Sequence, residues 1–144
     1  MRAASRPRVA SFLVLAALVA AACGSGSGTS PEPSAATGPI VVTFEVAGGE
    51  RFRVLLTEPA DIDIANRLAA GDNDAPSIPN GLVLRGQTGV NEGFTWSLDP
   101  NDFEFADVTI EVCDGVPSDV EAGLVTSDRY CPWSAIVARI QPAP

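Results

Sequence analysis

The first alternation of apolar and polar residues in the chain predicts a β-hairpin. Residues 40–46 and 51–56 place apolar side chains at every second position, which is typical of strands with one buried and one solvent-exposed face. The residues between the two strands include Gly48 and Gly49. Because the tight turns of hairpins need positive φ, two glycines at this place favour antiparallel pairing of the strands.

A helix is predicted to follow the hairpin. Pro59 suits the first turn of a helix, where its missing N–H removes no hydrogen bond, and Gly71 is favourable just after a helix end. Asp61 and Asp63 lie two positions apart, so they do not face each other on a helix, and we expect both to be solvated. The apolar stripe of the helix, which we expect to cover one face of the sheet, comprises Ile62, Ala65, Leu68 and Ala69.

Residues 72–140 are predicted to form shorter elements. The parity of the apolar positions changes near Ala106 and Asp107, so we expect a β-bulge or a break before the alternating residues Val108, Ile110 and Val112. We expect the other segments to be a loop at 72–81, strands at 82–85, 94–98 and 135–140, a turn at 99–102 and a short helix within 118–124. In the last strand, we expect the side chains of Ile136, Ala138 and Ile140 to point toward the core. Five or six short strands and one main helix make an α+β fold with a small antiparallel sheet.

The beginning of the chain has the features of an export signal. Residues 1–8 are positively charged, residues 9–22 form an apolar run of 14 residues, and Cys23 follows three alanines. The run is too short for a membrane-spanning helix, which takes about 20 residues. The sequence Ala-Ala-Ala-Cys resembles the bacterial lipobox, although Ala20 stands where that motif prefers Leu or Val. The alternative is an ordinary signal peptide that leaves no lipid on the mature protein.

These features predict the domain organisation and the location of the protein. Residues 1–22 are interpreted as a lipoprotein-type signal peptide, residues 23–39 as a disordered Gly/Ser/Pro tether, and residues 40–141 as a single α+β domain. We expect Cys23 to carry lipid, palmitate included, and so to anchor the exported protein to the bacterial cell membrane.

Composition and charge narrow the range of functions. The chain has 9 Lys+Arg against 18 Asp+Glu, a formal net charge of −9 and no His. An acidic surface repels nucleic-acid phosphates, so we expect no nucleic-acid partner. Without His the chain has no Ser-His, Cys-His or His-metal chemistry. We find no catalytic constellation in the sequence and expect no cofactor.

An acidic segment has a faint likeness to a calcium-binding loop. It contains Asp99, Asn101, Asp102 and Glu104 but lacks the glycine and the ligand spacing of such loops. Asp and Asn are favoured in turns, so we interpret these residues as turn residues and expect no metal site.

Cys113 and Cys131 could form a redox pair, a metal-binding pair or a structural disulfide. Their spacing is not C-x-x-C, and two thiolates without His or further Cys cannot complete a zinc site. With Cys23 lipidated, an even pair remains in an exported protein, which favours the disulfide. We expect the segment between the two cysteines to hold at most a short helix and little apolar surface.

Two tryptophans and a few carboxylates are the candidate functional residues. Trp96 lies in an alternating strand and is expected in the core, whereas Trp133 is expected to pack on the disulfide. The candidate binding surface comprises Trp133, Asp99 and Asp114. An enzyme that uses carboxylates alone would need two of them to converge beside an aromatic side chain. The only candidates for such a site are Asp99, Glu111, Asp114 and Trp133.

Four stretches of the chain, taken together, are similar to a known domain. They are Phe52-Arg53-Val54 with Thr57-Glu58-Pro59, Trp96-Ser97-Leu98-Asp99-Pro100, Phe105-Ala106-Asp107 leading into Ile110-Glu111-Val112-Cys113-Asp114, and Cys131-Pro132-Trp133-Ser134. Over residues 41–140 the chain resembles the N-terminal domain of a eukaryotic calmodulin-binding protein, and related domains occur alone as exported bacterial proteins. The resemblance implies a fold but no activity. Members often have His before Leu-Asp-Pro, where this chain has Ser97.

Calmodulin is not an expected partner despite this resemblance. Calmodulin targets present a basic amphipathic helix, whereas the predicted helix has Asp61 and Asp63 against Arg67. The sequence therefore predicts a lipid-anchored bacterial envelope protein with a small non-enzymatic domain that binds a protein or small ligand. The alternative is a carboxylate-dependent enzyme or accessory domain that acts on a cell-envelope substrate.

Overall fold

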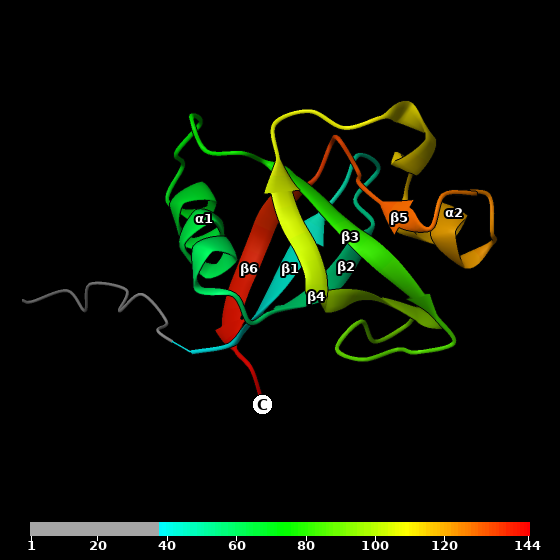
Figure 1. Cartoon of the computed structure of the whole chain (residues 1–144), viewed down its shortest axis with the longest axis horizontal. Helices are drawn as coiled ribbons and strands as arrows, with labels where there is room; N and C mark the ends of the chain where they lie inside the picture. Colours follow the sequence, from blue (N-terminus) through cyan, green and yellow to red (C-terminus); the bar gives the residue numbers. More distant parts are fainter. Residues whose placement is uncertain (1–37) are drawn as a thin grey trace, which may run out of the picture. The chain divides into compact units, whose positions relative to one another are not determined.

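The computed structural model describes residues 38–144, so the predicted signal peptide, Cys23 and most of the predicted tether lie outside the described residues. In this part of the chain, six strands form two three-stranded antiparallel sheets, with orders β2-β1-β6 and β4-β3-β5 (Figure 1). The α+β prediction is confirmed, with two sheets in place of one. The elements are β1 (Ile40–Glu45), β2 (Arg51–Leu56), α1 (Pro59–Ala69), β3 (Ile78–Arg85), β4 (Trp96–Ala106), the 3-10 turn η1 (Glu111–Cys113), α2 (Pro117–Glu121), β5 (Arg129–Tyr130) and β6 (Ile136–Pro142).

The hairpin of β1 and β2 forms as predicted. The strands pair antiparallel, with Phe44 opposite Phe52, and the two rings stack with centroids 5.2 Å apart. Gly48 and Gly49 have φ of 92° and 83°, so the turn uses the backbone freedom that only glycine offers without strain. The Val46 N–H closes the turn by donating to the Glu50 carbonyl oxygen.

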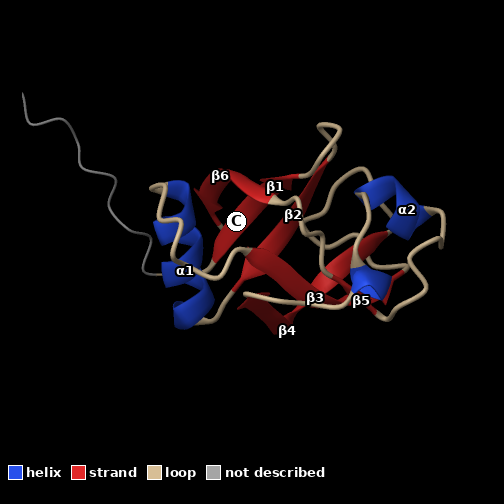
Figure 2. Ribbon diagram, turned by 90° about the horizontal axis from the view of Figure 1, so that it is seen from above, coloured by secondary structure: helices blue, strands red, loops and turns tan. Residues whose placement is uncertain are grey.

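Helix α1 also forms as predicted and lies at one end of the molecule (Figure 2). Gly71, with φ of 87°, follows its C-terminal cap, and its N–H donates to the Leu68 carbonyl oxygen. The helix packs mainly on β6 and more weakly on β4. The apolar stripe differs from the prediction at one position, because Ala69 is exposed and Ile64 packs on the core instead.

Asp61 corrects the expectation of a fully solvated acidic face on α1. Its side chain is half-buried, and burial raises the pKa of its carboxyl above the ordinary value. The backbone N–H of Phe105 partly offsets the effect of burial on this pKa. Asp63, in contrast, is exposed as expected.

Strand β3 corrects the expectation of a loop over residues 72–81. It begins at Ile78 and includes Pro79, Asn80 and Gly81, which have poor strand propensity. These residues pair with β4 in an antiparallel register, so tertiary pairing overrides local preference. Gly81 leaves room for the side chain of Leu98, because a Cβ at position 81 would lie 3.1 Å from Leu98 Cδ1.

Strand β4 likewise runs through residues 99–102, where a turn was predicted. Leu98 pairs with Val83 and Phe103 pairs with Gly81, so residues 99–102 lie opposite the single residue Leu82. The turn-favouring residues therefore form a bulge within a strand and do not reverse the chain. The strand also begins at Trp96, two residues later than predicted.

The predicted break near Ala106 is confirmed, but no strand follows it. Strand β4 ends at Ala106, which is paired with Ile78, the first residue of β3. Beyond that pair β3 offers no further partner, and residues 107–110 are irregular before η1. Val108, Ile110 and Val112 are consequently 83%, 68% and 60% exposed.

Strand β6 corrects the predicted inward face of the last strand. Thr43 pairs with Arg139 and Phe44 pairs with Val137, so Ala138 is an extra residue in β6. This bulge changes the parity of the strand, and Val137 and Ile140 pack on the core while Ile136 and Ala138 are exposed.

The core between the sheets is rich in aromatic side chains. Trp96 is buried as predicted, and its ring lies 5.4 Å from that of Tyr130 and 6.2 Å from that of Phe52. The segment between the cysteines supplies more apolar surface than expected, since Val120, Val125 and Tyr130 all belong to the core. Burial raises the pKa of Tyr130 far above its usual range, and its hydroxyl donates to the Gly115 carbonyl oxygen.

Candidate binding surface

The disulfide between Cys113 and Cys131 is present and confirms the structural interpretation of this pair. The Cα atoms of the two residues lie 5.1 Å apart, both side chains are buried, and the Cys131 N–H donates to the Cys113 carbonyl oxygen at 2.7 Å. The bridge joins η1 to the segment before β6. It lies at the opposite end of the molecule from α1, near α2 and β5 (Figures 1 and 2).

Trp133 is held in place beside this disulfide. Its backbone N–H donates to Asp114 Oδ1 at 2.9 Å, and its indole Nε1 donates to Thr109 Oγ1 at 2.7 Å. The side chain nevertheless remains 49% exposed. Two of the three predicted surface residues, Trp133 and Asp114, are thus in direct contact, and the ring has a fixed orientation.

Most of the exposed large apolar side chains of the described residues belong to one group. Four of the six belong to a group that we call the disulfide corner, namely Val108, Ile110, Val112 and Trp133. The hydrogen bond from the Trp133 indole to Thr109 connects the two segments of this group. No sequence signal indicates this exposure, because the alternation of residues 108–112 is equally typical of a buried strand.

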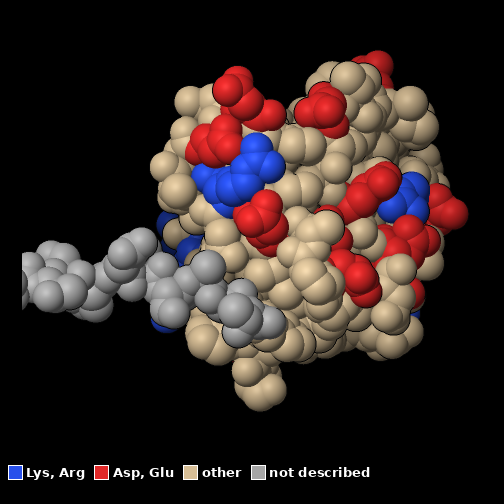
Figure 3. All heavy atoms as spheres, turned by 60° about the vertical axis from the view of Figure 1, so that its left-hand side comes forward, with Lys and Arg blue, Asp and Glu red and all other residues tan. Residues whose placement is uncertain are grey.

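Acidic side chains border the disulfide corner. Asp107 and Asp114 flank the segment that holds Val108, Ile110 and Val112, and Glu111 lies within it; Asp107 and Glu111 are exposed. Elsewhere on the molecule, Arg67 pairs with Asp72 and Arg129 pairs with Asp102. In the view of Figure 3 the arginine atoms form small islands among acidic groups.

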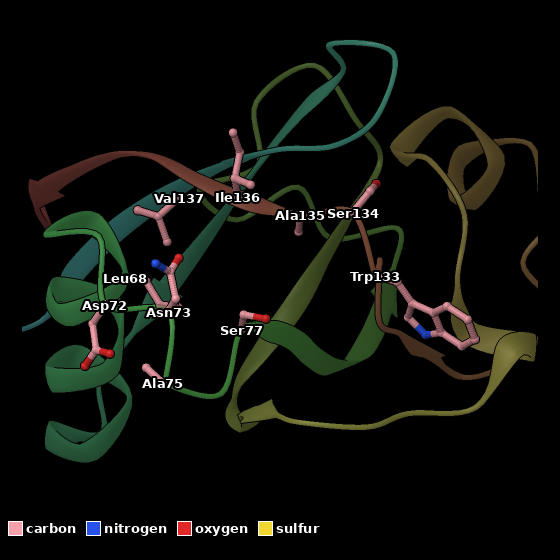
Figure 4. Close-up of a pocket in the computed structure, with 10 residues that line it drawn as sticks. All are labelled: Leu68, Asp72, Asn73, Ala75, Ser77, Trp133, Ser134, Ala135, Ile136 and Val137. Carbon is pink, nitrogen blue, oxygen red and sulfur yellow. The ribbon is translucent and has the colours of Figure 1, made fainter.

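A pocket of about 350 Å³ lies between the end of α1 and the beginning of β6 (Figure 4). Leu68, Ala75 and Val137 supply apolar side chains, and Asp72 is its single carboxylate. Trp133 borders this pocket, but its indole extends away from the other labelled side chains in Figure 4. The pocket and the disulfide corner are therefore neighbours that share one residue.

Asp99 lies apart from Trp133 and Asp114 in the hydrogen-bond pattern. It is in the bulge of β4, where its carboxylate accepts hydrogen bonds from the backbone N–H and side-chain amide of Asn101. The neighbouring carbonyl of Pro100 accepts a hydrogen bond from Thr57, just after β2. No hydrogen bond of the described residues joins Asp99 to the disulfide corner.

The acidic segment of β4 does not converge on a common point. Asp102 pairs with Arg129 and Glu104 accepts a hydrogen bond from Asn80, while Asp99 is bonded to Asn101. Within residues 38–144 there is no group of three or more His, Cys, Asp or Glu side chains that could hold a metal ion. The helices of the same residues include none long and apolar enough to cross a membrane.

Two hollows of the described residues also do not bring together a pair of carboxylates for acid–base chemistry. The pocket beside α1 has Asp72 and the groove on the β2-β1-β6 sheet has Glu92, each as its single carboxylate. Asp114 accepts the backbone N–H of Trp133, and Glu111 is exposed in η1.

Comparison with known proteins identifies the domain family. No curated protein and no solved structure matches the chain. A family model described as the BP-74 N-terminal domain matches residues 39–144, which include both sheets, both helices and the disulfide. The chain therefore belongs to the BP-74 N-terminal domain family.

Proposed function

We propose that this protein is exported to the bacterial cell envelope, is anchored there by lipid on Cys23, and binds a protein partner through the disulfide corner. The domain has no enzymatic role in this proposal. The observation that carries it is the exposure of Trp133, Ile110, Val112 and Val108 together on one disulfide-bonded corner. Exposed apolar patches mark interaction sites on proteins.

The fixed geometry of the corner supports a binding role. The indole of Trp133 is held by Thr109, its backbone by Asp114, and the two segments by the disulfide. A side chain that is already ordered loses little conformational entropy when a partner covers it. Tryptophan in such positions is also among the residues that contribute most to binding.

The charges around the corner indicate the chemistry of the partner. Along the chain, Asp107 precedes Val108, Glu111 lies between Ile110 and Val112, and Asp114 follows Cys113. Charges at the rim of an interface favour partners of opposite potential and disfavour those of like charge. The partner surface is therefore expected to have an apolar centre and basic residues at its edge.

Site-specific photo-crosslinking in intact cells tests the proposal. A photoreactive residue at Val112 should crosslink to one defined partner, and the same residue at Leu124 serves as the matched control. Leu124 is 70% exposed and also apolar, but it follows α2 and lies outside the disulfide corner.

Substitutions test whether the crosslink depends on the indole of Trp133 and on the negative charge of Glu111. Trp133→Ala and Glu111→Lys should each remove the Val112 crosslink, whereas Leu124→Ala should leave it unchanged. Equal crosslinking from Val112 and Leu124, or a crosslink that survives Trp133→Ala in a folded protein, would overturn the proposal.

A further inference from the structure

A second surface, which differs from the disulfide corner in its chemistry, lies on the outer face of the β2-β1-β6 sheet. There a groove of about 440 Å³ is lined by polar side chains of all three strands and of the loop that contains Asn91 and Glu92. Three arginines face it, namely Arg51, Arg53 and Arg139. This concentration is unusual in the chain, since residues 38–144 hold only six arginines against 17 acidic residues.

The strand register explains why two of these arginines flank one hydroxyl group. Thr43 of β1 is paired with Arg53 of β2 on one side and with Arg139 of β6 on the other. Neighbouring strands lie about 4.8 Å apart, so the Cα atoms of the two arginines are separated by about 10 Å. Their long side chains can therefore reach one small group placed above Thr43.

Arg139 differs from every other arginine in the described part of the chain. Arg51 pairs with Glu45 and Arg53 with Glu92, and both pairs are exposed enough to be weak. Arg67 and Arg129 pair with carboxylates, and Arg85 donates to two backbone carbonyls of the α2 region. Within residues 38–144, Arg139 alone forms neither an ion pair nor a side-chain hydrogen bond. Its guanidinium donors are thus available to a ligand.

We propose that this groove binds a small organic molecule that carries a phosphate or carboxylate group. Arg139 and Arg53 bind the oxyanion from its two sides, and the Thr43 hydroxyl donates to it from the floor. The planar guanidinium matches the geometry of either oxyanion and can donate two parallel hydrogen bonds. The volume of the groove is in the range of small-molecule sites, so the neutral body of the ligand occupies the remainder, beside Gln141.

Glu92 sets the affinity of the groove in this proposal. Its carboxylate lies 3.1 Å from Arg53 Nη1 and so occupies part of the guanidinium that the ligand would use. It is largely exposed, at 76%, and can move aside. Binding of the anion therefore exchanges one exposed ion pair for another, and removal of Glu92 should favour the ligand.

The test is an NMR titration of the ¹⁵N-labelled full-length protein with two anions and two neutral controls. Glycerol 3-phosphate represents phosphates and glucuronate represents carboxylates, while glycerol and glucose lack the charge. We expect at least one anion to shift the backbone signals of Thr43, Arg53 and Arg139 with saturation in the millimolar range, and neither neutral compound to do so. Comparison of the two anions shows which oxyanion is preferred.

Three variants make the result specific to the groove. Arg139→Gln should weaken binding by about tenfold, because a charged donor is lost, and Glu92→Gln should strengthen it. Arg67→Gln, which removes an arginine on α1 with the same loss of charge, should leave it unchanged. Absence of saturable shifts with both anions, or equal weakening by Arg139→Gln and Arg67→Gln in folded proteins, would overturn the proposal.

Discussion

The buried side chain of Asn91 donates a hydrogen bond from Nδ2 to the backbone carbonyl of Trp96 at 3.1 Å. The same amide accepts the Arg53 N–H on Oδ1 at 2.9 Å. Asn91 therefore connects the free edge of β2 in one sheet with the first residue of β4 in the other. Because the residue is 0% exposed, water cannot replace either hydrogen bond.

Asn91→Ala should lower the free energy of unfolding by about 3 kcal/mol, since it leaves two buried backbone groups without partners. Equilibrium denaturation by urea measures the change. Asn73→Ala is the matched control, because Asn73 is exposed, and it should change stability by less than about 0.5 kcal/mol. A loss at Asn91 no larger than the loss at Asn73 would show that Asn91 does not connect the sheets energetically.

Asp61→Asn is predicted to stabilise the protein by an amount that depends on pH. Burial raises the pKa of this carboxyl in the folded protein above its ordinary value of 3.8, so the group stabilises the fold when it is protonated. That contribution is complete below pH 3.8 and is lost as the pH rises through the folded-state pKa. Asp61→Asn cannot ionise, so it should become more stable than the wild type on going from acid to neutral pH.

Asp72→Asn provides the opposite case for the same measurement. The Asp74 N–H and then Arg67 hold the pKa of the Asp72 carboxyl below its usual range, so its contribution is present above pH 3.8 and is lost as the pH falls. Thermal melts of both variants are compared with the wild type from acid to neutral pH. At neutral pH, Asp61→Asn should have a higher Tm than the wild type and Asp72→Asn a lower one. The interpretation fails if Asp61→Asn loses stability at neutral pH.

The correct sequence predictions depend on local signals. The hairpin needed only alternation and two glycines with positive φ, and the helix needed only Pro59, the apolar stripe and Gly71. The core position of Trp96 follows from its alternating strand and from the preference of Trp for the core of a small domain, and the cysteine pairing follows from having two cysteines left for one domain.

The wrong predictions concern features that partners distant in sequence decide. Ile78 begins a strand because Ala106 lies opposite it, and the parity of β6 changes at Ala138 because of how it pairs with β1. Val112 is exposed because no strand continues beside residues 107–112. The sequence identified Trp133 and Asp114 as surface candidates. It missed the apolar residues beside them, because their exposure also depends on which strands pair.

Lipid attachment at Cys23 is a separate prediction, because this residue lies outside the described part of the chain. The protein should take up labelled fatty acid and partition with membranes, since each buried CH₂ of an acyl chain contributes about 0.8 kcal/mol. Cys23→Ala should abolish the labelling and release the protein from the membrane fraction. A variant that is labelled and retained as strongly as the wild type would contradict lipid anchoring at this residue.

Reduction of the disulfide should destabilise the domain substantially. The bridge joins residues separated by 18 positions, and in the chain-entropy model a loop of this size contributes about 3 kcal/mol. The enclosed segment supplies Val120, Val125 and Tyr130 to the core, so loosening it also weakens packing against Phe52 and Trp96.

Thiol counting and thermal melting check this prediction in the Cys23→Ala variant. The oxidised, unfolded protein should contain no free thiol, and reduction should lower Tm clearly. Fluorescence separates loss of the corner from global unfolding, since Trp133 is half-exposed and Trp96 is buried. At temperatures below the lowered Tm, reduction should change the accessibility of Trp133 to a quencher while Trp96 stays protected. Two free thiols in protein purified without reductant, or an unchanged Tm after reduction, would mean that the disulfide does not hold the corner in place.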